Sequence, residues 1–442
     1  MQEKLKNFNK DKNNFKKLLS KIKNKRTSIG VVGLGYVGLQ LAKTFLYSGN
    51  KVIGFESDNK KINLLKKRKS YINYIKDKEI KKMFYKKFII QNSYTKINSI
   101  DIIVLCLPTP VNNKNIPDIS IIKKAMKRMQ PYLKPFQVII LESTTFPGTT
   151  DEVLLPDIKK KFSIGKNFFL VYSPEREDPA NTKYSMSKTP KIVSGVTKNC
   201  LKAGNEIYKS AKIKTILVSS TKVAETSKLL ENTYRSVNIA LVNQLKKFCE
   251  KLNINVFDVI DAAKTKPFGF QAFYPGPGYG GHCIPVDPHY LFWKAKKLGV
   301  DLNFISLASK INNNMPTLVV EKIINFFKKN KKKLKSIIVI GAAYKKNVND
   351  TRNSPALKII ELLHKMKIKV SYYDPYVRSI KINRKIFKSK ILTKKLILNA
   401  EATLLVTDHE KIDYKLLVEN SKILFDSRGK FRNKVFSNVR FV

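Results

Sequence analysis

The residue whose neighbours point most clearly to chemistry is Cys283. Two glycines and a histidine precede it, and the run Ile-Pro-Val-Asp-Pro follows it, ending at Pro288. Residues 289–297 have a helical pattern. Because proline is tolerated only in the first turn of a helix, this helix should begin near residues 285–288. A cysteine at a helix N-terminus is favoured as its reactive thiolate, and flanking glycines would leave room for a substrate. Cys283 is therefore predicted to be a nucleophile rather than a buried core residue.

A dinucleotide-binding motif lies near the start of the chain. It is the GxGxxG sequence formed by Gly33, Leu34, Gly35, Tyr36, Val37 and Gly38. A predicted strand over residues 28–33 precedes it, a helix follows, and a second predicted strand, residues 51–55, ends at Glu56. Such glycines allow a tight turn and close backbone approach, the helix N-terminus takes a pyrophosphate, and the acid takes a ribose diol. Because Glu56 would repel a 2′-phosphate, we predict NAD rather than NADP as the cofactor. The alternative is an ordinary tight turn.

Other polar residues carry little weight from their spacing alone. Lys228 and Asn232 are four residues apart and share a helix face, but in a lysine-rich chain a solvated pair is the more common explanation. The same holds for Glu142, Glu175, Asp287 and Lys345. The cations Lys345, Lys346 and Arg352 follow a predicted strand and precede a helix, which suits a phosphate group, although general basicity explains them equally well.

The elements that must position these residues alternate between strands and helices. Buried strands are predicted at 28–33, 51–55, 100–107, 137–141, 168–172, 191–194 and 215–218, and again at 336–340, 369–373, 402–406 and 423–425. Helices are predicted between several of them, which is typical of a parallel α/β sheet. The sequence therefore predicts an α/β part, a helical part and a second α/β part.

Between the two α/β parts, one apolar stripe indicates a long helix. The stripe consists of Leu230, Tyr234, Val237, Leu241, Leu245, Phe248 and Leu252, spaced three or four residues apart. A helix of roughly 30 residues commonly separates two domains or forms a dimer seam. The segment 266–288 that follows is rich in glycine and proline, which predicts a shaped, functional loop.

The composition narrows the range of partners. The chain has 442 residues, with 86 Lys and Arg against 33 Asp and Glu, giving a net charge of +53. The excess is mostly lysine spread along the chain, which favours a compositional background over a specific nucleic-acid site. A polyanion-binding surface is the alternative.

Cysteine use and hydropathy bear on the compartment. The four cysteines show no CxxC spacing, which indicates neither a disulfide framework nor a zinc site and favours a reducing cytoplasm. No apolar run reaches the roughly 18 residues needed to span a bilayer. Residues 1–26 are a basic tail, amphipathic or frayed, that lacks the apolar core of a signal peptide.

Together these residues resemble the nucleotide-sugar 6-dehydrogenase family, which includes the UDP-glucose and GDP-mannose dehydrogenases, and above all its bacterial UDP-N-acetylglucosamine 6-dehydrogenases. The likeness covers about residues 27–442, and the string around Cys283 is its most specific part. Two departures are Glu56, where relatives commonly carry Asp, and Ala180, where they tend to have Gly. The matching strings lie at 33–38, 106–110, 142–150, 173–179, 231–241, 266–271, 274–288 and 343–352.

The resemblance implies an α/β fold with two Rossmann-type doubly wound domains joined by a long central helix, and a homodimer formed along that helix. The expected parts are a tail at 1–26, an NAD-binding domain at 27–220, a central helical domain with the cysteine loop at 221–318, and a UDP-sugar-binding domain at 319–442. The implied reaction is the four-electron oxidation of the C6 alcohol of a UDP-sugar to a carboxylate with two NAD, for the synthesis of surface polysaccharide precursors.

The resemblance also assigns roles to single residues. Cys283 would attack the aldehyde left by the first oxidation, giving a thiohemiacetal that can lose a second hydride and become a thioester. The other catalytic residues would be Lys228 for the oxyanion, Asn232 for the C6 oxygen, and Asp287, Glu175 and Thr144 for water. Cofactor contacts would come from Gly33, Gly35, Tyr36, Val37, Gly38, Glu56, Thr109, Glu142 and Arg352. Substrate contacts would come from Lys228, Asn232, Phe273, Tyr274, Gly280, Lys345 and Arg428.

The predicted substrate is UDP-N-acetylglucosamine (UDP-GlcNAc). UDP-glucose and the galacto and manno epimers, UDP-GalNAc and UDP-ManNAc, are the alternatives within the family. A β-hydroxyacid dehydrogenase is a more distant rival, but such enzymes lack the cysteine loop and the second Rossmann unit. A polyanion-binding protein on an enzyme-like scaffold is disfavoured because Lys228, Asn232, Cys283 and Asp287 are all present.

Overall fold

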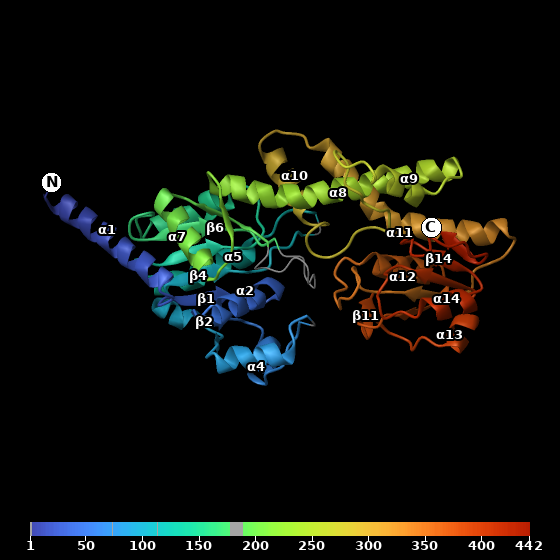
Figure 1. Ribbon diagram of the computed structural model, residues 1–442, viewed down its shortest axis with the longest axis horizontal. Coiled ribbons are helices and arrows are strands. Elements are labelled where there is room, and N and C mark those ends of the chain that lie inside the picture. The colour runs from blue at the N-terminus through green and yellow to red at the C-terminus, as the bar shows by residue number, and fades with distance from the viewer. Residues whose placement is uncertain (1, 73, 113, 177–188) are drawn as a thin grey trace. The chain divides into compact units, whose positions relative to one another are not determined.

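The chain folds into two compact units. The computed structural model describes residues 2–72, 74–112, 114–176 and 189–442. The first unit contains Met1–Glu231 and His289–Gly299, and the second contains Asn232–Pro288 and Val300–Val442. Each unit is built around its own mostly parallel sheet (Figure 1). The predicted α/β class with two Rossmann-type domains and a long central helix is therefore confirmed.

The first unit has an eight-stranded sheet in the order β3-β2-β1-β4-β5-β6-β7-β8. Neighbouring strands are parallel except β6 and β7, which are antiparallel. All the predicted strands of this part are present, and β3 is an additional one. The bounds are β1 Ser28–Val32, β2 Lys51–Phe55, β3 Ile89–Gln91, β4 Ile102–Leu105, β5 Val138–Leu141, β6 Phe169–Tyr172, β7 Lys191–Gly195 and β8 Thr215–Leu217.

The central strands β4 and β5 form because all their residues are Ile, Val or Leu and are buried on both faces, as in a parallel sheet covered by helices. Along β4, Ile102 and Val104 belong to one hydrophobic cluster, whereas Ile103 and Leu105 belong to another. Helices therefore cover both faces of the sheet, which is the doubly wound arrangement. The helices of this unit are α2 Tyr36–Tyr47, α3 Asn59–Lys66, α4 Asp77–Tyr85, α5 Ser120–Met129, α6 Leu155–Lys159 and α7 Lys198–Ser210, with short η1 Tyr94–Ser99, η2 Gln130–Tyr132 and η3 Thr149–Leu154.

The basic N-terminal segment is an amphipathic helix, α1 (Gln2–Lys23), rather than a frayed tail. Its apolar residues recur at i, i+3, i+4 and i+7, so they share one face. The Phe15 ring stacks on the Phe169 ring of β6, with their centroids 4.7 Å apart. This face of α1 belongs to a hydrophobic core of the first unit and consists of Phe15, Leu18, Leu19 and Ile22.

The second unit has a five-stranded parallel sheet in the order β10-β9-β13-β14-β15. This order repeats that of β2-β1-β4-β5-β6 in the first unit, so both sheets have the Rossmann arrangement. A separate antiparallel hairpin is made by β11 and β12. The bounds are β9 Ser336–Ile340, β10 Lys369–Tyr373, β11 Ser379–Ile382, β12 Lys385–Lys388, β13 Ala402–Leu405, β14 Leu424–Asp426 and β15 Val439–Phe441.

The predicted long helix is α8, which runs from Thr221 to Lys251 over 31 residues. Most of its apolar stripe is exposed: Leu230, Leu241 and Phe248 each keep 60% of their surface accessible. The stripe thus contributes little to the core of the single chain. The remaining helices are α9 Val256–Ala263, α10 Asp287–Lys297, α11 Asn303–Lys329, α12 Pro355–Lys365, α13 Lys394–Leu398 and α14 Tyr414–Asn420.

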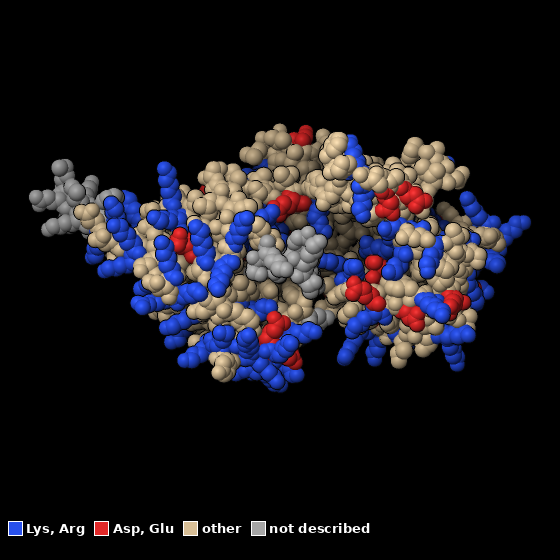
Figure 2. All heavy atoms as spheres, in the orientation of Figure 1, with Lys and Arg blue, Asp and Glu red and all other residues tan. Residues whose placement is uncertain are grey.

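Surface charge is distributed rather than focused. Figure 2 shows Lys and Arg side chains scattered over the visible face of both units, with Asp and Glu among them. This distribution favours the compositional explanation of the basic excess over a dedicated polyanion patch on that face. Among the described helices, none combines the length and apolar character that crossing a bilayer requires.

Candidate active site

The glycine motif forms a cradle between β1 and α2. Gly33 has a φ of +89°, and a Cβ there would come within 2.6 Å of the Cys106 carbonyl oxygen. A Cβ on Gly38 would lie 1.8 Å from the carbonyl oxygen of Gly33. A Cβ on Gly35, in contrast, would meet nothing within 4 Å. The first and third glycines therefore allow the tight turn and close packing, and the second leaves open space for a pyrophosphate at the start of α2.

Glu56 lines a pocket of about 280 Å³ beside this cradle. Its Oε2 accepts a hydrogen bond from the Leu34 N–H at 3.1 Å and from the Lys61 ammonium at 3.3 Å. Its Oε1 accepts from the N–H groups of Ser57 and Asp58 at 2.9 and 3.0 Å. Each oxygen already has two donors, so a ribose hydroxyl would take the place of the longest bond, that to Lys61. The pocket and the acid fit NAD as the sequence predicts.

Several predicted residues lie at the carboxyl ends of the strands in the first sheet, where ligands of open α/β sheets bind. Glu142 directly follows β5, and Thr144 is half-buried in the same loop. Glu175 follows β6 and is held to Glu142 through Lys191, whose Nζ lies 2.6 Å from Glu142 and 2.9 Å from Glu175. Thr109 is buried after β4, and its carbonyl accepts from the Tyr290 hydroxyl at 2.9 Å.

The loop that carries Thr144 is tied to α8. Glu225 accepts hydrogen bonds from the Gly148 N–H at 2.5 Å and from the Thr150 N–H at 2.9 Å. Burial raises the pKa of Glu225 to about 7, although these hydrogen bonds oppose the rise. Lys228 is buried on the same helix, three residues further on. The contact with Glu225 thus fixes the start of α8, and with it Lys228, against the loop after β5.

In the second unit the structure brings Asn232 and Asp287 together. The Asn232 amide donates to Asp287 Oδ2 at 2.5 Å, and both residues are buried. Cys283, four residues before Asp287, is exposed. Thr144, Glu175 and Lys228 belong to the first unit, whereas Asn232, Cys283 and Asp287 belong to the second.

One prediction about the cysteine loop is confirmed and another is wrong. The helix α10 begins at Asp287, within the predicted range 285–288, and the Cys283 carbonyl accepts from the N–H groups of Val286 and Asp287 at 3.0 and 2.8 Å at the start of that helix. The flanking glycines, however, do not provide room for substrate. A Cβ on Gly280 would lie 2.6 Å from the Tyr344 Cβ, and one on Gly281 would lie 2.7 Å from the ring of Tyr344. These glycines are needed for close packing.

The partner of the cysteine loop is the loop that follows β9. The Gly281 N–H donates to the Arg352 carbonyl at 2.8 Å, and the Asn353 amide donates to the Gly281 carbonyl at 3.0 Å. The Arg352 side chain pairs with Asp350, with 2.6 Å between Arg352 Nη2 and Asp350 Oδ2. Lys345 lies in the same loop, half-buried. The predicted substrate cation and the nucleophile are thus carried by two loops that bind each other.

Three other predicted substrate residues, Arg428, Tyr274 and Phe273, also belong to the second unit. Arg428 donates from Nε to the Val406 carbonyl at 2.6 Å, and its Nη1 lies 3.1 Å from where a Cβ on Gly276 would be. The Tyr274 hydroxyl donates to Asp261 at 2.5 Å, so this hydroxyl is engaged within the protein. Phe273 packs edge-on against Tyr234.

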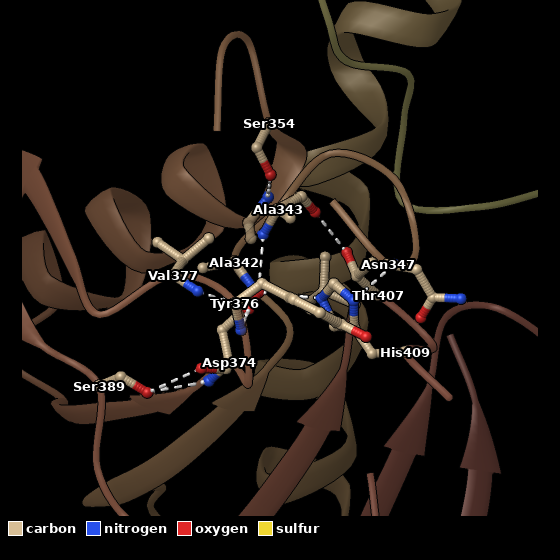
Figure 3. Close-up of polar contacts among 12 residues, drawn as sticks. Ala342, Ala343, Asn347, Ser354, Asp374, Tyr376, Val377, Ser389, Thr407 and His409 are labelled. Atoms are coloured by element: carbon tan, nitrogen blue, oxygen red, sulfur yellow. Dashed lines mark hydrogen bonds and ion pairs between the residues drawn. The ribbon is translucent and has the colours of Figure 1, made fainter. Parts of the chain in front are cut away.

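The second sheet lacks the open cradle of the first (Figure 3). After β9, the N–H groups of Ala342 and Ala343 donate to Asp374 Oδ2 at 2.7 and 2.9 Å. The His409 ring receives the Asn347 N–H on Nδ1 at 2.9 Å, which leaves Nε2 as the donor to Asp374 at 3.0 Å. The backbone donors that would face a pyrophosphate are therefore already used by a side chain.

Sequence reasoning missed Lys191, Glu225, Asn353 and His409. Lys191 is one lysine among many, and only the antiparallel course of β7 brings it beside the carboxylates. Asn353 has a φ of +50°, which a sequence does not reveal. The string at 173–179 and the departure at Ala180 fall partly or wholly within 177–188, outside the described residues. The described residues contain no group of three or more His, Cys, Asp or Glu that could hold a metal ion.

Comparison with known proteins agrees with this geometry. Residues 27–212 match the NAD binding domain of the UDP-glucose/GDP-mannose dehydrogenase family, residues 222–314 its central domain, and residues 338–433 its UDP binding domain. The chain belongs to the UDP-glucose/GDP-mannose dehydrogenase family and is an NAD-dependent nucleotide-sugar dehydrogenase.

Individual relatives are similar over most of their length. A UDP-N-acetyl-D-mannosamine dehydrogenase of Methanocaldococcus jannaschii is 35% identical over 79% of this chain and 79% of its own. A UDP-N-acetyl-D-glucosamine 6-dehydrogenase of Salmonella typhi is 34% identical over 80% of this chain and 84% of its own. The solved structure of a UDP-ManNAc dehydrogenase from Pyrococcus horikoshii has a TM-score of 0.84 and 29% identity, covering 94% of this chain and 98% of that one.

Proposed function

We propose that this enzyme oxidises C6 of a UDP-N-acetylhexosamine to the carboxylate, and that the sugar is UDP-ManNAc. The observation that carries the reaction type is the exposed Cys283, four residues before Asp287, which is buried and bonded to the Asn232 amide of the same unit. The choice of sugar rests on the names of the relatives at 35% and 29% identity. The sequence prediction placed UDP-GlcNAc first and the manno epimer among the alternatives; the relatives favour the alternative.

A nucleophilic cysteine is what a four-electron oxidation at one carbon needs. NAD would be held by the cradle after β1 and would supply the hydride acceptor. An aldehyde has no tetrahedral carbinol carbon from which a second hydride can leave. Addition of the Cys283 thiolate to the aldehyde carbon forms a C–S bond and restores that carbon. After the second hydride has left, water cleaves the resulting thioester, releasing the carboxylate and the thiol.

The other residues that the family likeness singles out would supply the groups that this sequence of steps requires. Asn232, whose amide donates to Asp287, is fixed in position to hold the C6 oxygen. Lys228 stabilises the oxyanion that develops at C6. Asp287 and Glu175, with Thr144, position or activate the hydrolytic water. Lys345 and Arg428 bind the UDP part in the second unit.

UDP-GlcNAc is the second candidate sugar, because the Salmonella typhi relative named for it is 34% identical, almost the same as the first. The test measures NADH formation with UDP-ManNAc, UDP-GlcNAc, UDP-GalNAc and UDP-glucose and counts the NADH formed per sugar. We expect two NADH per sugar and the highest kcat/KM with UDP-ManNAc. A single NADH per sugar would contradict the full oxidation, and a preference for UDP-GlcNAc would overturn the choice of epimer.

We also propose a homodimer formed along α8. The exposed stripe on this helix, including Leu241 and Phe248 at 60% exposure each, is a contiguous apolar surface that a second copy would cover. Replacing Leu241 and Phe248 together by Glu should give a monomer in analytical ultracentrifugation. A dimer that survives both charges would place the interface elsewhere.

We propose a cytoplasmic role in the synthesis of surface polysaccharide precursors. The four cysteines are free thiols in the structure, which suits a reducing compartment.

A further inference from the structure

A buried ammonium group lies between two carboxylates at the carboxyl edge of the first sheet. Lys191, the first residue of β7, contacts Glu142 Oε2 at 2.6 Å and Glu175 Oε2 at 2.9 Å. The side chains of Lys191 and Glu142 are 4% and 0% exposed, and that of Glu175 is 13% exposed. Because β7 runs antiparallel to β6, its first residue meets the end of β6 and thus Glu175.

The contacts of this group define its position closely. The Lys191 ammonium has three N–H bonds, and its Nζ lies within 3.4 Å of a third acceptor, the Pro174 carbonyl. Glu175 is held on both oxygens, by Lys191 on Oε2 and by the Arg176 N–H on Oε1 at 2.8 Å. A carboxylate held on both oxygens has one orientation and a stabilised negative charge.

Glu142 is also held on its second oxygen, by the phenol of Tyr208. The Tyr208 hydroxyl of α7 donates a short hydrogen bond to Glu142 Oε1. Burial raises the pKa of Glu142 to about 7, an increase that Lys191 opposes and Glu175 reinforces. The titratable groups facing Lys191 are thus Glu142, Glu175 and Tyr208, with the Cys106 thiol near Glu142. Of the two carboxylates, Glu175 is the less buried, with 13% of its side chain exposed against 0% for Glu142.

We infer that Lys191 is a positioning residue for the proposed reaction, and that its bridge to Glu142 holds Glu175 in one orientation as an anion. This inference rests on the role proposed for Glu175 in positioning or activating water. Replacing buried ions by apolar side chains of the same volume is often neutral or stabilising, because removing charges from water costs free energy. We therefore attribute the buried ammonium of Lys191 to the orientation of Glu175 rather than to the stability of the fold.

The experiment compares Lys191→Met, Lys191→Arg and the double variant Glu142→Gln/Lys191→Met with wild type. Lys198→Met, at the exposed start of the neighbouring helix α7, is the matched control. We expect Lys191→Met to lower kcat by about ten- to hundred-fold with the KM for the UDP-sugar within about two-fold. Its acidic limb in the pH profile of kcat should move to higher pH, because losing a nearby cation raises a carboxyl pKa. Lys191→Arg should recover part of kcat.

The double variant separates positioning from structure. It removes one buried anion and one buried cation, so unfolding stability should recover towards wild type, while kcat stays below that of Glu142→Gln alone, the reference needed because Glu142 is a predicted cofactor contact. Recovery of kcat along with stability would overturn the inference, as would a Lys191→Met enzyme whose kcat and acidic limb equal those of Lys198→Met.

A measurement without turnover keeps the two proposals distinct. The titration of the Glu175 carboxyl can be followed by infrared difference spectra between each protein and its Glu175→Gln counterpart. We expect a higher midpoint in Lys191→Met than in Lys198→Met. Equal midpoints would overturn the inference about Lys191, whereas a wild type that forms no NADH with any of the four sugars would overturn the proposed function.

Discussion

The side-chain amide of Asn353 donates a hydrogen bond to the carbonyl oxygen of Gly281, two residues before Cys283, at 3.0 Å. The adjacent N–H of Gly281 is held by the Arg352 carbonyl at 2.8 Å. The loop that carries Lys345 thus binds both the N–H and the carbonyl of Gly281 in the cysteine loop. Within the second unit, Lys345, proposed to bind the nucleotide, and Cys283, proposed to attack the sugar, are therefore carried by two loops that are hydrogen-bonded to each other.

Asn353→Asp should impair catalysis without unfolding the protein. The left-handed backbone at residue 353, with a φ of +50°, is tolerated by Asp, but a carboxylate cannot donate to the Gly281 carbonyl and repels it. We expect kcat to fall by about ten- to hundred-fold, equivalent to about 1.4–2.7 kcal/mol in the barrier. Asn383→Asp, at another left-handed position in an exposed hairpin, is the control. Equal activities of the two variants would show that this bond does not position Cys283.

Cys283→Ser should abolish net formation of the acid, because serine is much less nucleophilic than a thiolate. We expect the yield of NADH per sugar to collapse while NAD binding is unchanged. Cys249→Ala, which removes a buried thiol on α8, should remain active. A Cys283→Ser enzyme with the wild-type NADH yield would refute the covalent mechanism.

Glu56→Ala should weaken NAD binding and reduce the discrimination against NADP. The substitution removes a negative charge from the pocket and four hydrogen bonds that fix the glycine loop and the start of the next helix. We expect the KM for NAD to rise by about ten-fold and the NADP-to-NAD ratio of kcat/KM to rise with it. An unchanged ratio would place the ribose contact on another residue.

Asp374→Asn should destabilise the second unit in a pH-dependent way. Burial alone would raise the pKa of Asp374, but the hydrogen bond from His409 and those from backbone N–H groups lower it overall. A depressed folded-state pKa gives stability that is present above the unfolded pKa of about 4 and is lost as the pH falls through the folded value. Urea unfolding should therefore show a loss of about 2–4 kcal/mol at pH 7 that shrinks below about pH 4. A constant difference across pH would contradict this assignment.

Phe15→Ala should show that α1 is part of the first unit. Phe15 is 8% exposed and stacks on Phe169, so its truncation removes buried area and leaves a cavity. We expect a loss of about 2–4 kcal/mol in the unfolding of this unit, measured in urea. Lys16→Ala, on the exposed face of the same helix, should have almost no effect. Equal stability of the two variants would mean that the helix is dispensable.

The strands could be predicted because buried parallel strands are short, continuous apolar runs rich in β-branched residues, as in β4 and β5. α1 was harder, because its apolar residues are diluted by lysines and the partner of Phe15, Phe169, is far away in the chain. Asn232 and Asp287 received separate roles only through the family likeness, since spacing alone gave these residues no weight, and their contact is visible only in the structure. Gly280 and Gly281 were interpreted wrongly because a sequence cannot tell an open glycine from one whose missing Cβ is filled by Tyr344.

Asp374, which accepts hydrogen bonds from the loop after β9, has a consequence for the order in which cofactor and sugar would react. With Asp374 occupying the donors there, the cradle after β1 is the cofactor site that the geometry supports, so the proposed two oxidations share it in turn. In that case NADH would have to be exchanged for NAD at this cradle after the first oxidation and before the second. The cradle belongs to the first unit and Cys283 to the second. The unit that would exchange the cofactor is therefore not the unit whose cysteine would hold the sugar intermediate. Exchange of the cofactor between the two oxidations need not release that intermediate.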